Sequence, residues 1–192
     1  MTLHPLVERA AHGEIPTWAV ATPERRGHLG RVAGLLDSWA PALATSDVDG
    51  LRFVAVGYLH DALRDAEPES LRRHVPPDLS TLAGPLLHGP AAAERLRLEG
   101  VEDGELLSAV AYHTLGHQRL GVLGRALYAA DFLEPGRDLR NEWREGLRSR
   151  MPGDLEGVVR EILAGRIAYV TDSGRPLRPE TVGFWNSMAT EG

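Results

Sequence analysis

The sequence predicts an all-α protein. Apolar residues recur at helical spacing along most of the chain, and Pro, Gly, Ser, Thr and Asp residues fall where helices would begin and end. No stretch keeps the alternation of apolar and polar residues that marks a half-buried strand. With 192 residues, the chain is most simply one domain with a sizeable core.

The clearest predicted helix covers residues 22–40. Thr22 can cap its amino end, Pro23 suits the first helical position, and Glu24 complements the helix dipole. Pro41 is predicted to end it. Further helices are predicted over residues 5–12, from Ser46 through His60, and over 68–75, where Pro76 and Pro77 end the helix. A helix over 84–100 is predicted to break or restart after His88 because of Pro90. The next helix is predicted over 101–116, with Gly116 as its C-cap.

The last part of the chain is predicted to be helical as well, with helices over residues 120–136, 138–150, 154–170 and 179–188 and a turn at 171–176. These boundaries suggest an N-terminal helical segment (1–21), a central helical unit (22–138) and a C-terminal helical extension (139–192) that packs on the same domain.

Composition excludes several kinds of site. A net charge of -6 speaks against binding to duplex nucleic acid, and no apolar run is long enough to span a bilayer. The chain has no cysteine, so any metal must be held by His, Asp or Glu. All 21 basic residues are arginine, which excludes a Schiff-base or P-loop lysine. The N-terminus lacks a secretory signal, so we expect a cytoplasmic protein.

Several metal-type side chains lie on or near apolar helix faces. Each one alone is most simply a hydrogen-bonded core or surface residue, and an aspartate could cap a helix or pair with an arginine. Together they favour a metal site, because burying several unpaired polar groups is costly. Adjacent helical residues point about 100° apart, so a neighbouring His and Asp can reach one ion. The set comprises His28, His60, Asp61, His88, His113 and Asp131.

The order of these residues resembles the HD-domain metallophosphohydrolases, which have a lone His, a His-Asp pair, further His residues and a distant Asp. The segments LLHGPAAAERL (86–96), AYHTLG (111–116) and LYAADFLEPGRD (127–138), together with WN (185–186), are similar to the YqeK branch of that family. Those bacterial enzymes hydrolyse diadenosine tetraphosphate symmetrically to two ADP. The resemblance runs from about residue 22 to 188. It implies an HD-domain helical bundle with a small C-terminal helical extension.

The resemblance also implies a divalent metal centre of one or two ions, with iron favoured and Mn or Co as alternatives. His28, His60, Asp61 and Asp131 would hold the first ion. Asp61 would bridge toward a second site lined by His88 and His113. Asp61, His60 and His88 would be the catalytic residues, and either His88 or His113 could instead protonate the leaving group.

For the nucleotide, the resemblance implies contacts from Arg64, which stands where the family usually has a lysine, and from Thr114, Arg137, His88, His113 and Asp131. The turn TDSGR (171–175) would lie over the nucleotide through Thr171, Gly174 and Arg175. Plainer alternatives stay open: Arg64 and Arg137 could pair with Asp65 and Asp138, Thr114 could simply end a helix, and the turn could be only a loop. Leu115 departs from the family's second Thr.

The expected function is therefore symmetrical hydrolysis of diadenosine tetraphosphate to two ADP by metal-activated water. Two alternatives remain at this stage: an HD phosphohydrolase acting on a nucleoside monophosphate, a dNTP or a cyclic nucleotide, and a module that senses nucleotides without turnover. The expected partner is a small nucleotide rather than nucleic acid or a membrane, and a homodimer is left open.

Overall fold

A computed structural model describes residues 2–136 and 141–189, and within them all regular structure is helical, as the sequence predicts. The elements are α1 (Pro5–Ala11), α2 (Pro23–Leu43), α3 (Asp47–Leu59), α4 (Pro68–Arg72), the 3₁₀ turns η1 (Pro77–Leu79) and η2 (Gly84–Leu86), α5 (His88–Leu98), α6 (Gly104–Tyr112), α7 (Val122–Leu133), α8 (Asn141–Arg150), α9 (Leu155–Asp172) and α10 (Pro179–Met188).

Local sequence signals fix many of these ends. The Thr22 hydroxyl accepts a hydrogen bond from the backbone N–H of Arg25 at 3.2 Å, which caps α2 as predicted. The Asp103 carboxylate caps α6 in the same way, at 3.0 Å from the N–H of Leu106. α6, however, ends at Tyr112 with His113 as its C-cap, so Gly116 is not the predicted cap; it closes the turn that follows, with φ +73°, a conformation that glycine adopts without strain.

Two proline predictions were wrong in detail. Pro41 does not end α2, which continues to Leu43. Its ring leaves only the carbonyl of Asp37 without a helical donor, and that residue lies on the exposed face, where water can replace the bond. Pro90 does interrupt the predicted 84–100 helix, but α5 begins at His88, so the proline lies in the first turn, where its missing N–H costs little.

Other boundaries also differ from the prediction. α4 stops at Arg72, and the following residues form a turn instead of a further helical turn. α9 continues to Asp172, so the first two residues of the predicted 171–176 turn are helical. The Thr171 hydroxyl donates to carbonyls of its own helix, which suits a helical position better than a loop.

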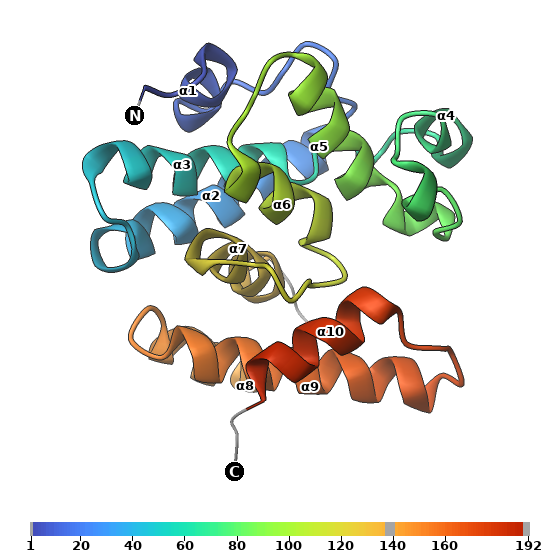
Figure 1. Ribbon diagram of the computed structural model, residues 1–192. Helices are drawn as coiled ribbons and strands as arrows, with labels where there is room; N and C mark the ends of the chain where they lie inside the picture. The colour runs from blue at the N-terminus through green and yellow to red at the C-terminus, as the bar shows by residue number, and fades with distance from the viewer. Residues whose placement is uncertain (1, 137–140, 190–192) are drawn as a thin grey trace.

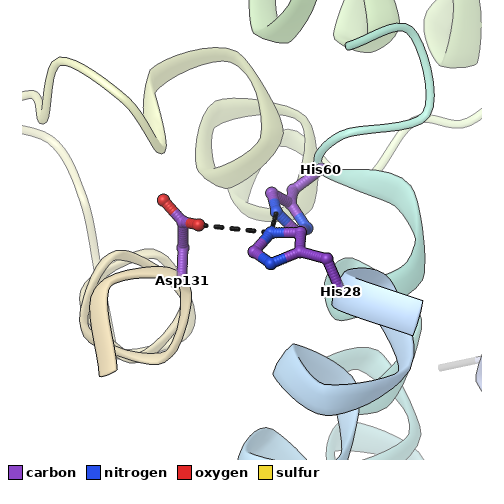
Figure 2. A group of neighbouring side chains, drawn as sticks. All are labelled: His28, His60 and Asp131. Carbon is purple, nitrogen blue, oxygen red and sulfur yellow. Dashed lines mark hydrogen bonds and ion pairs between the residues drawn. The ribbon is translucent and has the colours of Figure 1, made fainter. Parts of the chain in front are cut away.

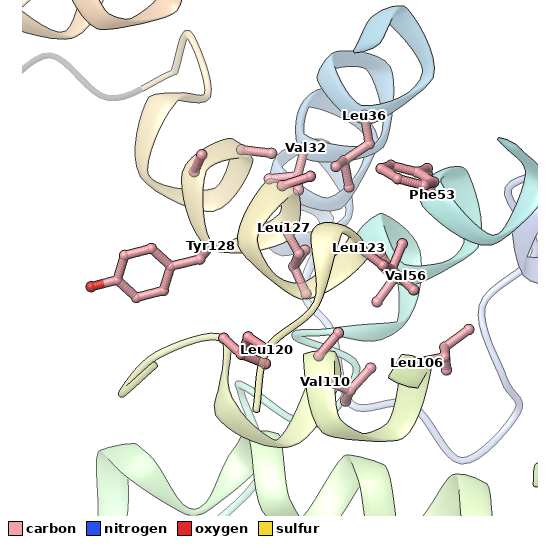
Figure 3. Packing of buried hydrophobic residues seen from close by; sticks show 14 of the residues in the cluster. Val32, Leu36, Phe53, Val56, Leu106, Val110, Leu120, Leu123, Leu127 and Tyr128 are labelled. Carbon is pink, nitrogen blue, oxygen red and sulfur yellow. The ribbon is translucent and has the colours of Figure 1, made fainter. Parts of the chain in front are cut away.

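The main core forms around α7. Figure 1 shows α8, α9 and α10 on one side of α7 and the earlier helices on the other. Leu123 of α7 lies beside Val56 of α3, Leu127 points toward Val110 of α6, and Tyr128 projects away from both (Figure 3). Packing on both sides of α7 holds the helix ends that carry the polar residues. No helix in the described ranges is long and apolar enough to cross a membrane.

Candidate metal centre

All six predicted ligands converge at one place, as the resemblance implies. Their exposed fractions range from 0% to 7%, so water satisfies almost none of their polar atoms. They come from five helices or helix ends: His28 on α2, His60 and Asp61 at the end of α3, His88 at the start of α5, His113 at the end of α6 and Asp131 on α7.

The first cluster is formed by His28, His60 and Asp131 (Figure 2). The Nε2 atom of His28 lies 3.3 Å from the Nε2 atom of His60 and 3.3 Å from Oδ1 of Asp131. One ligand atom from each residue therefore lies within reach of a common point, which is the arrangement that a transition-metal ion requires.

The second cluster is formed around Asp61. Its Oδ1 atom lies 3.0 Å from Nε2 of His88 and 3.3 Å from Nε2 of His113, and these two nitrogens are 3.1 Å apart. The other carboxylate oxygen, Oδ2, faces the first cluster at 3.7 Å from His28 and 3.8 Å from His60. One carboxylate thus faces both clusters, as a bridging ligand would.

The hydrogen bonds of the rings fix which nitrogen carries the proton. Nδ1 of His60, His88 and His113 lies 2.8 to 2.9 Å from a backbone carbonyl three residues earlier in each case. A carbonyl can only accept, so each Nδ1 carries the hydrogen and each Nε2 presents a lone pair. Nδ1 of His28 faces the Glu134 carboxylate at 3.4 Å, which has the same consequence.

Lone pairs therefore face each other across the site. In the neutral rings, the paired Nε2 atoms at 3.1 and 3.3 Å have no proton to share, and the carboxylate oxygens beside them are also acceptors. Such a buried set of acceptors needs a cation at its centre. Neutral imidazole and carboxylate are ligands for Fe, Mn, Co and Zn, so the donor set fits a divalent metal.

Burial and charge keep most of these groups in their metal-binding forms. Burial lowers the pKa of His60 to about 4 and also lowers that of His88, against the opposing pull of Asp61. Burial alone would raise the pKa of Asp61, but the surrounding imidazoles hold it well below its usual range. The pKa of His113 moves upward, since the Asp61 carboxylate outweighs the effect of its burial.

Two glycines allow the helices to come this close. A Cβ on Gly57 of α3 would lie 2.6 Å from Cα of Ala33 on α2, the pair of helices that brings His28 to His60. A Cβ on Gly89 of α5 would lie 2.9 Å from backbone carbonyls of α6, the pair that brings His88 to His113. Each pair of imidazoles therefore sits beside a glycine at a helix contact.

Sequence reasoning missed two further residues at the site. Glu134, which is 2% exposed, accepts from Arg31 Nε at 2.6 Å besides facing His28. Arg25 donates from Nη1 to Asp61 Oδ2 at 2.7 Å. Glu134 lies in the segment LYAADFLEPGRD, three residues and about one helical turn after Asp131, and this spacing could have predicted its place at the site. No local sequence feature marks Arg25.

The first group of predicted nucleotide contacts, Arg64 and Thr114, lies near the second cluster. Arg64 lies close enough to His88 for its charge to lower that pKa, and Asp65 pairs with Arg25 and the N–H of Thr22 instead. The Thr114 hydroxyl lies 3.0 Å from Nε2 of His113, at the edge of the second cluster.

The second group consists of the three predicted nucleotide contacts near the C-terminal end of α9, and their described contacts are local. Thr171 hydrogen-bonds within α9, Gly174 adopts φ +66° in the turn, and the Arg175 guanidinium lies 5.2 Å from the centre of the Tyr169 ring. Among the described residues, no hydrogen bond or ion pair joins these three to a metal ligand. Arg137 and Asp138 lie outside the described residues.

Comparison with known proteins agrees with the resemblance. The family model described as "HD domain" matches residues 25–143. A protein of Halalkalibacterium halodurans named "Bis(5'-nucleosyl)-tetraphosphatase, symmetrical" is 31% identical over 107 residues, which are 55% of this chain and 56% of that protein. A protein of the same name from Staphylococcus aureus is 38% identical over 63 residues, which are 32% of each chain. Another, from Bacillus subtilis, is 27% identical over 106 residues, which are 55% of this chain and 56% of that protein.

The matched regions thus span about half the length, or less, of these curated relatives. A solved structure described as a predicted HD superfamily hydrolase involved in NAD metabolism, from Clostridium acetobutylicum, superposes with a TM-score of 0.74 over 95% of this chain and 94% of that one. Its sequence identity is 21%, so it shows the fold. The family model covers more than half of the chain, and the chain belongs to the HD domain family.

Proposed function

Because the chain belongs to the HD domain family, we propose that it hydrolyses diadenosine tetraphosphate symmetrically to two ADP, with water activated by one or two divalent metal ions. Iron is the favoured metal, and Mn or Co are alternatives. The observation that carries this proposal is the Asp61 carboxylate, which directs one oxygen to His88 and His113 and the other toward His28 and His60.

The residues present would hold the metal in two groups. His28, His60 and Asp131 offer one ligand atom each to the first ion, and His88 and His113 offer theirs to the second. Bound divalent ions supply Lewis acidity, which lowers the pKa of a coordinated water and offsets phosphate charge. Asp61 would fix the water between the two groups, because both of its oxygens already face them.

Symmetric cleavage breaks the central anhydride of the tetraphosphate. The water oxygen bonds to one central phosphorus, and the bridging oxygen leaves with the other ADP and takes up a proton. His88 or His113 could supply that proton only where its Nε2 atom does not bind a metal, and the Thr114 hydroxyl lies 3.0 Å from Nε2 of His113. Arg64, beside His88, would stabilise the charge that develops on the phosphate oxygens.

The choice of substrate rests on the relatives. Three of them carry the name symmetrical bis(5'-nucleosyl)-tetraphosphatase. The turn at 171–175 and Arg137 would contribute the remaining nucleotide contacts. These contacts stay predictions, and the fold alone does not select the nucleotide.

The test is anaerobic purification with elemental analysis, followed by chromatography of the products formed from diadenosine tetraphosphate. Two ADP as the sole products are the expected result. AMP plus ATP, or no reaction, would instead favour a different nucleotide. Tight ADP binding without hydrolysis under any divalent metal would favour a sensing module. Asp61→Ala serves as the inactive control.

A further inference from the structure

An arginine from α9 reaches the metal centre from outside the matched HD region. Nη2 of Arg166 lies 3.6 Å from Oδ2 of Asp131, and its Nη1 atom donates to the backbone carbonyl of Thr114 at 2.8 Å. The first partner belongs to the first cluster and the second adjoins His113 of the second cluster. One guanidinium therefore connects both halves of the site.

The guanidinium is itself held in place. Its central carbon lies 4.7 Å from the centre of the Tyr128 ring and 5.5 Å from that of Phe132, both on α7. About a quarter of the side chain is exposed (26%). The rings limit the rotation of the guanidinium and shield part of it from water, which makes its ion pair stronger than one on the open surface.

The geometry of Asp131 shows what such an arginine does. Its Oδ1 atom faces Nε2 of His28 at 3.3 Å, while Oδ2 faces Arg166. A carboxylate with a cation on one oxygen cannot rotate that oxygen toward the metal position without losing the ion pair. The arrangement thus presents one chosen oxygen to the ligand set, in the way that outer-shell partners orient metal ligands.

We propose that Arg166 is a positioning residue for the metal centre, which it serves by orienting Asp131 and by fixing the Thr114 carbonyl beside His113. The proposal rests on the metal centre of the proposed function and adds that α9 is part of it. An HD region that ends at residue 143 would then lack one of the groups that define its own ligand geometry.

Arginine suits this position better than lysine. Its planar fork reaches two acceptors in fixed directions, whereas a lysine ammonium is a single point charge on a flexible stem. A carboxylate on α7 and a carbonyl after α6 are two such acceptors. Arg166→Lys should therefore keep the charge but lose the simultaneous contact.

The test compares Arg166→Gln with Arg160→Gln in the full chain. Arg160 is an equally suitable arginine of α9: it donates from Nε to the carbonyl of Met188 at 3.0 Å, and so holds α10 but none of the ligand segments. Dissociation constants for Mn²⁺ are measured on metal-free protein by the electron paramagnetic resonance of free Mn²⁺, and thermal unfolding is measured in parallel.

We expect Arg166→Gln to weaken Mn²⁺ binding about 10- to 100-fold. Arg160→Gln should change the dissociation constant for Mn²⁺ by less than about threefold. Both variants lose one contact between helical segments, so both are expected to lower the melting temperature by a similar amount. In an Asp131→Asn background, Arg166→Gln should add no more than about threefold, because the carboxylate that it orients is already gone and only its contact with the Thr114 carbonyl is left to lose. Equal Mn²⁺ affinities for the two glutamine variants would overturn the proposal.

If Arg166→Gln does not fold, Arg166→Lys is compared with Arg160→Lys by the same criterion. A weakening of Mn²⁺ binding confined to Arg166→Lys supports the proposal, and equal binding overturns it. Failure of the wild-type protein to bind any Mn²⁺ or Fe²⁺ would instead defeat the metal centre itself. The two failures are thus distinguishable, because neither measurement depends on turnover of a nucleotide.

Discussion

The two halves of the metal centre are held together in different ways. In the second cluster, the rings of His88 and His113 are oriented by backbone carbonyls three residues earlier in the chain. In the first cluster, His28 and Asp131 depend on charged side chains from distant segments, Glu134 and Arg166. His60 belongs to the first cluster but is anchored locally, like the second.

The difference shows that ligand identity and ligand orientation are encoded at different ranges. A helix end that presents a histidine and its own carbonyl carries its orientation with it. A ligand oriented by a side chain far along the chain acquires its geometry only when the helices have packed. The first cluster should therefore be the more sensitive to changes outside the ligands, and four predictions test this comparison.

The largest effect should come from Asp61→Asn, because Asp61 is the residue that both clusters share. The neutral amide removes the negative charge between the two imidazole groups, so both ions should bind weakly. We expect turnover to fall by about a thousandfold or more, equivalent to ~4 kcal/mol of transition-state stabilisation. The measurements are initial rates of product release and metal content.

Asp37→Asn, on the exposed face of α2, is the matched control and should be unaffected. If Asp61→Asn removed only one ion, the carboxylate would belong to a single cluster and would not join the two.

The second prediction concerns pH and the locally anchored His60. Its pKa is about 4 in the folded protein and near 6.5 when unfolded, so the unfolded state binds more protons between these values. The free energy of unfolding of the metal-free protein should therefore fall as pH falls from 6.5 to 4, by up to about 3 kcal/mol. His88, with its lowered pKa, adds to the loss, whereas the raised pKa of His113 changes the free energy of unfolding mainly above pH 6.5, outside this range.

Urea unfolding of the metal-free protein at pH 7, 5.5 and 4.5 measures this slope. The same series on His60→Asn should show a shallower dependence on pH. An equal slope in the variant would mean that His60 is not the group responsible.

Glu134→Gln tests whether the first cluster depends on its long-range carboxylate. Gln keeps the size of the side chain but removes the charge that faces Nδ1 of His28. We expect metal affinity at one site to weaken about 10- to 100-fold, with the other site nearly unchanged, because outer-shell carboxylates raise ligand basicity. Titration calorimetry with Mn²⁺ would resolve the two sites.

The control is Glu94→Gln, since among the described residues Glu94 pairs only with Arg97 of its own helix. Equal weakening of both sites by Glu134→Gln would remove the distinction between the clusters.

The smallest effect should come from Arg64→Gln, which tests whether the arginine near His88 binds the nucleotide and not the metal. Arg64 lowers the pKa of His88 through its charge but, within the part of the chain that the structure describes, donates no hydrogen bond to the six ligands. We expect KM to rise about tenfold, equivalent to ~1.4 kcal/mol, with metal content unchanged. Arg73→Gln, on the exposed end of α4, is the control. A loss of metal instead of a rise in KM would assign Arg64 to the ligand shell.

The sequence predicts the ligands well because their chemistry is local. A histidine near an apolar helix face is visible in one dimension, and so is a cap such as Thr22. Glu134, Arg166 and Arg25 act across long separations in the chain, and an exposed salt bridge and a buried positioning contact look the same in sequence. Pro41 was misjudged for a similar reason, since the exposure of Asp37 decides whether the helix tolerates it.

The two tight helix contacts give evolution a simple way to tune this centre. The missing methyl groups at Gly57 and Gly89 set how near the imidazoles of each pair can come. Restoring one methyl would push a helix outward and widen a single pocket, leaving every ligand unchanged. Ions differ in the ligand distances they prefer, so metal preference in this chain can drift through positions that never touch the metal.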